Sequence, residues 1–405
     1  MNVLFLSPGF PAEMPLFVRG LAQVGAKVFG IGDQPPQALP KEARHGLADY
    51  LQVQSLGDEN ATIQAVRNWL RGRSIDRVES LWETQMFLAA RMRKEFALPG
   101  MTVEQTLPFR DKESMKLAVE KAGIRVPRHG RARTVQEAWA AVERTGYPAI
   151  VKPIAGAGSK DTHRCNDKAE FERALQATRH VDELSVEEFI EGEELTYDTI
   201  CRDGNVLYEN VAWYRPKPLD LQHNPWISMQ NIVLRDLSQP LPRPGVELGR
   251  RVLKALSFET GFTHMEWFHT KKGEAVFGEI GARAAGARLV HAMNYANDMD
   301  LFRAWAHAVV HGTLGQDVTR KYNAAMVFKR ADGEGIVRRY DGLEGLMQRY
   351  GQHVANLELT PIGEPRRDWR KVIVGDGWIV VRHPDLPFTQ EMADRFCSDL
   401  RVVAS

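Results

Sequence analysis

The sequence is poor in cysteine, with only three in 405 residues. Cys165, Cys201 and Cys397 lie far apart and form no C-x-x-C pair, so neither a disulfide framework nor a cysteine zinc site is expected. A reducing, cytoplasmic location fits this usage best. The 53 basic and 52 acidic residues nearly cancel, which leaves no electrostatic footprint for nucleic acid or for an anionic membrane.

Long apolar runs and two common nucleotide motifs are also absent. No stretch approaches the ~20 apolar residues that cross a bilayer. The start, Met1–Leu6, has no basic lead, which predicts a first buried strand and not a signal peptide. No G-x-G-x-x-G follows this strand, and the glycine loop at 155–160 does not match G-x-x-x-x-G-K-[ST]. Dinucleotide binding is therefore not supported, a P-loop is excluded, and phosphate binding must come from a few placed residues.

The length exceeds what one hydrophobic core usually supports, so several domains are expected. Over residues 1–107 apolar runs alternate with helical patterns, which is typical of a parallel sheet covered by helices. The residues that follow mix strands and helices like an α+β unit with an antiparallel sheet. We predict an N-terminal α/β domain at 1–107, two units at 108–190 and 191–323, and a C-terminal subdomain at 324–405.

The first chemical signal is a lysine at the end of a strand, followed by a glycine loop. Lys152 precedes the loop 155–160, which contains Gly156, Gly158 and Ser159. A fixed cation and a backbone without Cβ atoms suit close contact with phosphate oxygens. A surface hairpin with a solvated lysine explains this pattern equally well.

The second signal is an apolar strand that runs into acidic residues, from Val186 to Glu194. Backbone groups at the end of such a strand can pair with a purine edge, and a carboxylate can accept hydrogen bonds from ribose hydroxyls. An ordinary strand with a charged turn is the alternative.

The third signal is a pair of strands that each deliver a carboxylate. Glu266 lies in the first, and Glu279 in the second is followed by Gly281 and Arg283. In an extended segment Glu279, Gly281 and Arg283 share one face, because alternate side chains point the same way. Mg²⁺ prefers oxygen ligands, commonly one or two carboxylates plus phosphates. A salt-bridged sheet face is the alternative.

In this order the signals resemble the ATP-grasp superfamily, which includes D-alanine ligases, biotin carboxylase and L-amino acid ligases. The resemblance runs from Asp111, where Asp111-Lys112 opens a helix, to about His311. It implies a parallel α/β domain ahead of an ATP-grasp module with an antiparallel sheet. In that module 108–190 would be the nucleotide-binding lid subdomain and 191–323 the catalytic subdomain.

The resemblance implies ATP and Mg²⁺ as cofactors and a role for each site residue. These roles are phosphate binding for Lys112, Lys152 and the glycine loop, backbone pairing with adenine for Glu187 and Ile190, ribose binding for Glu194, metal binding for Glu266 and Glu279, and catalysis at the phosphoryl group for Arg283. The family's common pattern is Glu-x-Asn-x-Arg. Here Gly281 replaces the Asn, which removes one ligand of a second Mg²⁺.

The arrangement as a whole most resembles the carboxylate–amine ligases, including the L-amino acid ligases. The implied reaction activates a carboxylate as an acyl phosphate, which an amine captures, with release of ADP and phosphate. The partners would be small-molecule acid and amine substrates, and a homodimer is compatible with this interpretation. Other ATP-grasp chemistry (carboxylation, thiol ligation or phosphotransfer) and a non-catalytic nucleotide-binding module are the alternatives.

Two further residues are candidates for substrate contacts. Arg288 follows the Glu279–Arg283 segment closely and would pair with a substrate carboxylate through a bidentate fork. Glu83 follows the fourth predicted strand, at the edge where open α/β sheets place ligands, and would hold an amino group. A solvent-facing helix position explains Arg288 as well, and the case for Glu83 is equally balanced.

Overall fold

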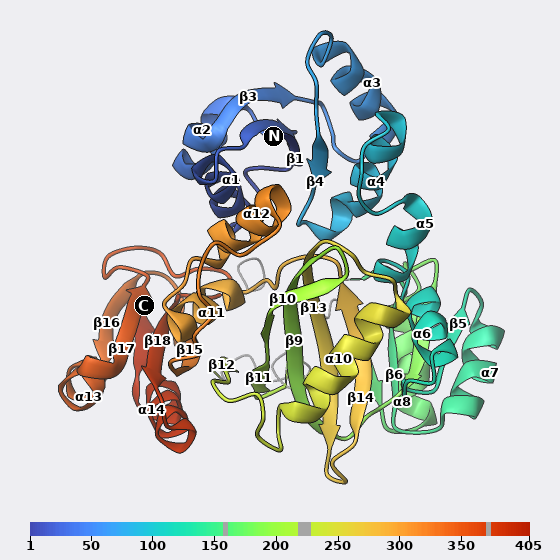
Figure 1. The fold of residues 1–405 in the computed structure, drawn as a ribbon. Helices are drawn as coiled ribbons and strands as arrows, with labels where there is room; N and C mark the ends of the chain where they lie inside the picture. Colours follow the sequence, from blue (N-terminus) through green and yellow to red (C-terminus); the bar gives the residue numbers. More distant parts are fainter. Residues whose placement is uncertain (157–160, 218–227, 370–373) are drawn as a thin grey trace.

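A computed structural model describes residues 1–156, 161–217, 228–369 and 374–405. The predicted fold class is confirmed: a parallel α/β domain precedes antiparallel sheets with helices. Figure 1 shows the N-terminal domain at the top, a small lid unit at the lower right and the C-terminal elements at the lower left, around a central sheet. No helix of the described residues is both long and apolar enough to span a bilayer.

The N-terminal domain is built on a four-stranded parallel sheet of order β3-β2-β1-β4. Its elements are β1 (Asn2–Leu6), α1 (Met14–Gln23), β2 (Lys27–Gly32), α2 (Lys41–Gly46), β3 (Leu47–Gln52), α3 (Glu59–Trp69), β4 (Arg77–Glu79), α4 (Met86–Glu95) and α5 (Val103–Thr106). The middle of β1 is fully buried because helices cover both faces of the sheet.

The lid unit carries its own antiparallel sheet, of order β5-β8-β6-β7. Its elements are β5 (His129–Ala132), α7 (Val135–Thr145), β6 (Ala149–Pro153), β7 (His163–Cys165), α8 (Lys168–Ala177) and β8 (Leu184–Glu188). Apolar side chains of α7 and α8 pack on this sheet and form a core of their own. Lys152 lies near the end of β6, so the packing of this small core fixes the position of its backbone.

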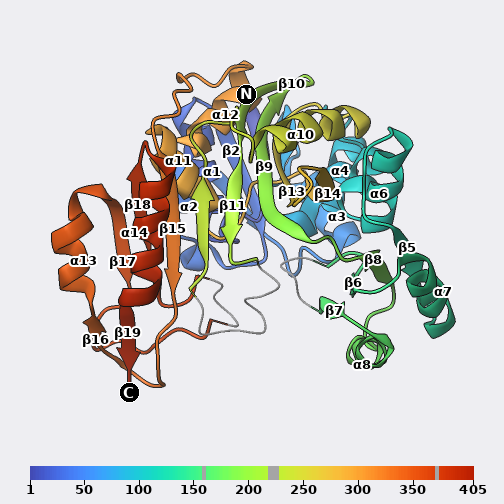
Figure 2. The ribbon, with the colours of Figure 1, turned by 90° about the horizontal axis from the view of Figure 1, so that it is seen from below.

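A nine-stranded sheet, counted over the described residues, forms the centre of the molecule. Its path is β14-β13-β9-β11-β12-β15-β18-β17, with β10 on β9 (Figure 2). The strands are β9 (Gly192–Arg202), β10 (Asn205–Asn210), β11 (Ala212–Arg215), β12 (Gln230–Val233), β13 (Gly261–Thr270), β14 (Ala275–Gly281), β15 (Asn323–Lys329), β17 (Val354–Leu359) and β18 (Gly377–His383). The sheet thus continues across the predicted boundary at residue 323, and the boundaries remain predictions.

Helices cover this sheet and connect it to the other units. They are α6 (Lys112–Lys121), α10 (Arg243–Ala255), α11 (Leu289–Asn297), α12 (Leu301–His311), α13 (Leu343–Tyr350) and α14 (Leu386–Asp399), and a two-stranded sheet pairs β16 (Val337–Asp341) with β19 (Arg401–Ala404). In Figure 1, α10 lies across β9, β13 and β14. Its apolar side chains share a core with those strands, which leaves the opposite face of β13 and β14 for polar residues.

A β-bulge in β14 decides which side chains reach that polar face. Glu266 pairs with Glu279, but the next residue of β13, Trp267, pairs with Phe277, so Gly278 is the extra residue. Without the bulge Phe277 and Glu279 would share a face. With it, Phe277 packs in the α10 core while Glu279 is directed away from that core.

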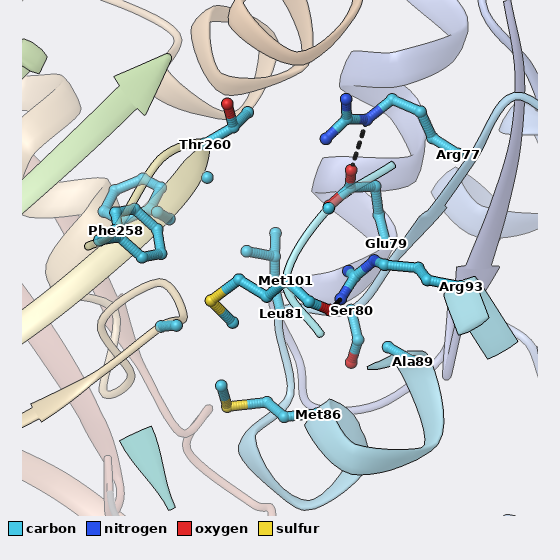
Figure 3. Close-up of a pocket in the computed structure, with 14 residues that line it drawn as sticks. Arg77, Glu79, Ser80, Leu81, Met86, Ala89, Arg93, Met101, Phe258 and Thr260 are labelled. Carbon is cyan, nitrogen blue, oxygen red and sulfur yellow. Dashed lines mark hydrogen bonds and ion pairs between the residues drawn. The ribbon is translucent and has the colours of Figure 1, made fainter. Parts of the chain in front are cut away.

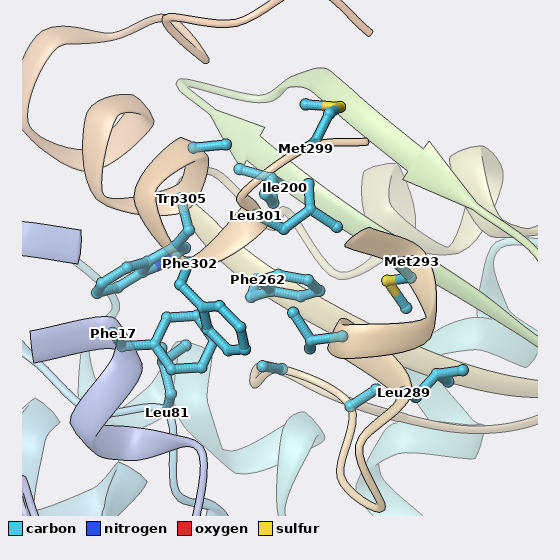
Figure 4. Packing of buried hydrophobic residues seen from close by; sticks show 14 of the residues in the cluster. Phe17, Leu81, Ile200, Phe262, Leu289, Met293, Met299, Leu301, Phe302 and Trp305 are labelled. Carbon is cyan, nitrogen blue, oxygen red and sulfur yellow. The ribbon is translucent and has the colours of Figure 1, made fainter. Parts of the chain in front are cut away.

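The N-terminal domain is joined to the central sheet by a shared apolar core (Figure 4). The ring of Phe17 from α1 lies 4.9 Å from that of Phe302 and 5.2 Å from that of Trp305, both on α12. Phe262 of β13 extends the same cluster. The carboxyl end of β4 is thereby fixed close to the catalytic strands.

A cavity of about 30 Å³ lies between the N-terminal domain, which lines it with several polar side chains, and the segment that includes Phe258 and Thr260 (Figure 3). Arg77 pairs with Glu79 at 2.8 Å. Arg93 donates hydrogen bonds to the Val78 carbonyl at 2.7 and 3.0 Å, and burial lowers its pKa. These bonds lie within the N-terminal domain and hold β4 and α4 together.

Replacing Gly278 with Ala should destabilise the protein by about 1–3 kcal/mol, because the added Cβ would lie 2.8 Å from the Glu266 carbonyl oxygen, on backbone that cannot move aside. Urea unfolding measures the effect. The matched control is Gly345→Ala in α13, where a Cβ meets nothing within 4 Å, and a gain of about 0.5–1 kcal/mol is expected. Equal stabilities of the two variants would contradict the role of the bulge.

Candidate functional site

Glu266 and Glu279 face each other across β13 and β14, as the sequence pattern predicts. Their side chains are 28% and 30% exposed, so the pair is neither buried in the core nor free in solvent. Two carboxylates side by side form a region of high negative charge. Cations from two other elements approach it.

Those cations belong to a chain of alternating charges that runs from α6 through the lid to β14. The Lys116 Nζ lies 2.8 Å from a Glu187 carboxylate oxygen, and the other oxygen of Glu187 lies 3.1 Å from the Lys152 Nζ. Lys152 is also 3.7 Å from Glu279, which lies 3.2 Å from the Lys112 Nζ. The predicted phosphate lysines and one predicted metal ligand therefore contact each other directly.

The pKa values follow from this chain. Burial alone would raise the pKa of Glu279, but Lys112 and Lys152 overcome it and lower the pKa to about 2. Burial alone would also lower the pKa of Lys152, yet Glu187 and Glu279 raise it above its usual value. Burial lowers the pKa of Lys116, and Glu187 opposes that shift. Glu187 itself, held by two lysines, has a pKa far below normal despite its burial.

Lys112 makes a second contact that ties the glycine loop to α6. Its Nζ donates a hydrogen bond of 2.7 Å to the Gly156 carbonyl. The N-terminus of α6 is capped by Asp111, whose carboxylate accepts from the Ser114 N–H at 2.8 Å and also binds Arg131. Of the predicted loop residues, Gly158 and Ser159 lie outside the described residues.

The three residues predicted for the nucleoside lie in β8, in the turn after it and in β9. Glu187 differs from the prediction, because its backbone lies between β5 and β6 in the sheet and its carboxylate carries the contacts described above. Ile190 lies just after β8, and neither its N–H nor its carbonyl makes a hydrogen bond within the described residues. Glu194, on β9, is buried, and burial together with Glu266 raises its pKa to about 8.

A buried histidine, His264, lies next to Glu266. The His264 Nδ1 lies 2.6 Å from Asp198, and its Nε2 lies 3.6 Å from Glu266. Burial alone would lower the His264 pKa, but Asp198 outweighs it and the pKa rises to about 9. Asp198 is fully buried and also accepts from Thr196 at 2.7 Å. Glu266 is therefore held beside a cation even before any metal is considered.

Arg283 is held by the N-terminal domain. Its Nε donates to Glu83 at 2.8 Å, and the second carboxylate oxygen of Glu83 binds Arg110. Both oxygens of Glu83 face arginines, and its predicted contact with a substrate amino group stays a prediction. Glu83 fixes Arg283, a residue 200 positions away.

Arg288, at the start of α11, has a separate set of contacts. Its backbone is left-handed, with φ of 59°, and its N–H donates to the buried Glu13 at 3.2 Å. The guanidinium lies over the Trp378 ring at 4.7 Å and makes no ion pair with any described carboxylate. It lies 3.4 Å from the His291 Nε2, and the His291 pKa is lowered to about 4 by burial and by Arg288.

The sequence arguments did not identify four of these residues, namely Lys116, Asp198, His264 and Arg110. Lys116 had a usable signal: it follows Lys112 by four residues on a helix, so both lie on one face. Asp198 and Arg110 become neighbours of the site only through the fold.

The site offers two carboxylates and no larger metal-binding set. Among the described residues, no group of three or more His, Cys, Asp and Glu side chains could hold a metal ion. Two carboxylates do fit Mg²⁺ when phosphate oxygens complete its coordination. Glu266 and Glu279 therefore suit a metal that arrives with a nucleotide.

The raised pKa of Glu194 gives a pH prediction for the nucleotide-free protein. Below about pH 4 the carboxyl is protonated in both folded and unfolded states. Between there and about pH 8 only the unfolded state ionises, so this group lowers stability as the pH rises. Glu194→Gln should thus gain stability over the wild type from pH 4 to 8, by on the order of a few kcal/mol in urea unfolding. Parallel pH profiles would contradict the assignment.

Residues 111–206 match the family model for the carbamoyl-phosphate synthase L chain, ATP binding domain. The chain is 27% identical over 218 residues to an L-arginine-specific L-amino acid ligase from Bacillus subtilis, which covers 52% of each protein. It is 25% identical over 228 residues to the alanine–anticapsin ligase of the same species, covering 51% of this chain and 48% of that one.

A crystal structure of an L-amino acid ligase from Bacillus licheniformis has the same fold, with a TM-score of 0.79 at 19% identity over 100% of this chain and 98% of that one. The chain spans about half the length of these two curated relatives. The resemblance noted from the sequence motifs is confirmed. This chain contains an ATP-grasp domain, and the proteins similar to it in sequence and fold include L-amino acid ligases.

Proposed function

We propose that the protein is an ATP-dependent ligase that activates a carboxylate as an acyl phosphate and joins it to an amine, with release of ADP and phosphate. The observation that carries this proposal is the pairing of Glu266 with Glu279 beside Lys112 and Lys152. Two adjacent carboxylates and two lysines, supplied by separate elements, suit a metal-bound polyphosphate. The similarity to ligases supports bond formation driven by ATP as the type of reaction.

The nucleotide would occupy the space between the lid and the catalytic strands. Lys112 and Lys152, which now neutralise Glu279, would turn to the phosphate oxygens. The Ile190 backbone, without a hydrogen-bond partner among the described residues, would pair with adenine. Glu194, buried and with a raised pKa, would bind ribose hydroxyls, which satisfy a carboxyl in either protonation state.

Mg²⁺ would be held by Glu266 and Glu279, whose contacts with His264 and the two lysines fix their orientation. Such an ion neutralises charge on the phosphate oxygens during transfer. Gly281 offers no side-chain ligand, so one Mg²⁺ is the simplest expectation.

Phosphoryl transfer would depend on positive charge positioned before the reaction begins. Arg283 has one nitrogen fixed by Glu83 and another bonded to the Ala284 carbonyl at 3.0 Å. Its planar guanidinium keeps further N–H groups for the transferring phosphoryl group. The substrate carboxylate attacks the γ-phosphorus, ADP leaves, and the amine then displaces phosphate from the acyl carbon.

The first substrate would be anchored by Arg288, which no described carboxylate neutralises. Trp378 supports the flat face of its guanidinium, and Glu13 holds its backbone. Both contacts leave the edge of the fork for a carboxylate ligand. The location in the cytoplasm and a homodimer remain predictions.

The proposal is tested by incubating the protein with ATP, Mg²⁺ and amino acids, singly and in pairs. Phosphate release, separation of spent nucleotide and product mass are measured. ADP, phosphate and an amide-linked product are expected. AMP and pyrophosphate would contradict the acyl-phosphate route, and a phosphorylated acid without an amide would favour phosphotransfer.

In the same assay Glu279→Gln should reduce turnover at least a hundredfold, on the order of 3 kcal/mol, because one metal ligand and the partner of two lysines are lost. Circular dichroism checks that the variant is folded. The matched control is Glu274→Gln, an exposed glutamate of the turn before β14, which should keep wild-type turnover. A folded, fully active Glu279→Gln would contradict the metal assignment.

Arg288→Ala should raise the Michaelis constant of the acid substrate about ten- to a hundredfold, the effect of losing one charge-assisted contact, and leave that of ATP unchanged. Arg288→Lys should recover only part, because lysine cannot form the fork. Arg303→Ala, on the exposed face of α12, is the control. A changed ATP constant with an unchanged acid constant would place Arg288 in the nucleotide site.

A further inference from the structure

Lys116 is a fully buried lysine to which neither the sequence motifs nor the proposed reaction gives a task. Its side chain is 0% exposed, and its Nζ donates to Glu187 at 2.8 Å. An ammonium group so completely removed from water is costly unless it is paired, and a methionine of similar length would fill the same space. Its presence beside the nucleotide lysines therefore calls for an explanation beyond packing.

The partner of Lys116 is shared with Lys152. One oxygen of Glu187 accepts from Lys116 and from Ser185, both at 2.8 Å, and the other lies 3.1 Å from Lys152. Glu187 is itself 4% exposed, so water does little to weaken these contacts. A single carboxylate thus divides its charge between two lysines.

This sharing has a consequence for Lys152. If Glu187 faced Lys152 alone, the two would form a neutral pair. The positive charge of Lys152 would then be neutralised, and its side chain would be held in place. With Lys116 on its other oxygen, the group of Lys116, Glu187 and Lys152 carries one net positive charge. Lys116 comes from α6, whose Lys112 lies one turn earlier on the same helix face, so both cations approach from one rigid element.

We propose that Lys116 is a positioning residue for the triphosphate site: by binding Glu187 it leaves the charge of Lys152 available to the phosphates of ATP. The inference rests on the proposed function, since it needs ATP at this site. It requires no contact between Lys116 and the nucleotide, which agrees with the complete burial of the Lys116 side chain.

The test measures equilibrium binding of ATP and of adenosine by calorimetry, without acid or amine substrates. Lys116→Met should weaken ATP binding about tenfold and leave adenosine binding unchanged, because only the phosphates sense the lost charge. Lys116→Arg keeps the charge and should bind ATP within about threefold of the wild type. Lys121→Met removes an exposed charge from the same helix and should have no effect.

The double variant Lys116→Met/Glu187→Gln separates charge from packing. It restores the single positive charge at Lys152, so its ATP affinity should return to within about threefold of the wild type. Because both partners of the buried pair are removed together, this variant should fold even where Lys116→Met does not. It then decides the question by itself.

The outcomes are distinguishable. If the double variant binds ATP as weakly as Lys116→Met, or if ATP and adenosine weaken alike, Lys116 acts through packing and the inference is wrong. Equal ATP affinity of wild type and Lys116→Met would also overturn it while leaving the proposed function intact. Failure of the wild-type protein to bind ATP would overturn both.

Discussion

The register of three antiparallel strands, β9, β13 and β14, is the constraint on which the site depends. It sets Glu266 opposite Glu279, while the bulge at Gly278 turns Phe277 into the core. Because side chains alternate along a strand, a slip of β14 by one residue would turn Glu279 towards the core and Phe277 away from it. Because the side chains that pack against α10 must be apolar, the carboxylates are held on the opposite face of these strands.

Once those carboxylates are fixed, the surrounding charges follow. Glu279 gathers Lys112 and Lys152, and Glu187 gathers Lys152 and Lys116, so that each buried charge has an opposite neighbour. Such pairing offsets the cost of removing ions from water, although it adds little net stability. On the proposed function its benefit is catalytic, because cations arranged in advance would need no reorganisation when phosphate charge develops.

The sequence could predict what depends on local patterns. The positions of Glu266 and Glu279 on two strands follow from such patterns, and the alternation of strands and helices correctly indicates a parallel N-terminal sheet. Contacts between distant segments were beyond such patterns. The ion pair of Glu83 with Arg283 joins residues 200 positions apart, across two units that share an apolar core, and no local pattern indicates it. The bulge escaped prediction because a single strand sequence does not state where its partner pairs.

The two sides of the site are held by different forces. The N-terminal domain shares an apolar core with α12 and the central strands, so its carboxylate Glu83 keeps Arg283 in a fixed place. The lid has a separate core, and at the site Lys152 meets the catalytic strands through an ion pair with Glu279. Exchanging that carboxylate for phosphate oxygens changes only ionic contacts and leaves both cores intact. On the proposed function, a nucleotide would therefore enter and leave between the lid and the strands without disturbing the arginine on which phosphoryl transfer would depend.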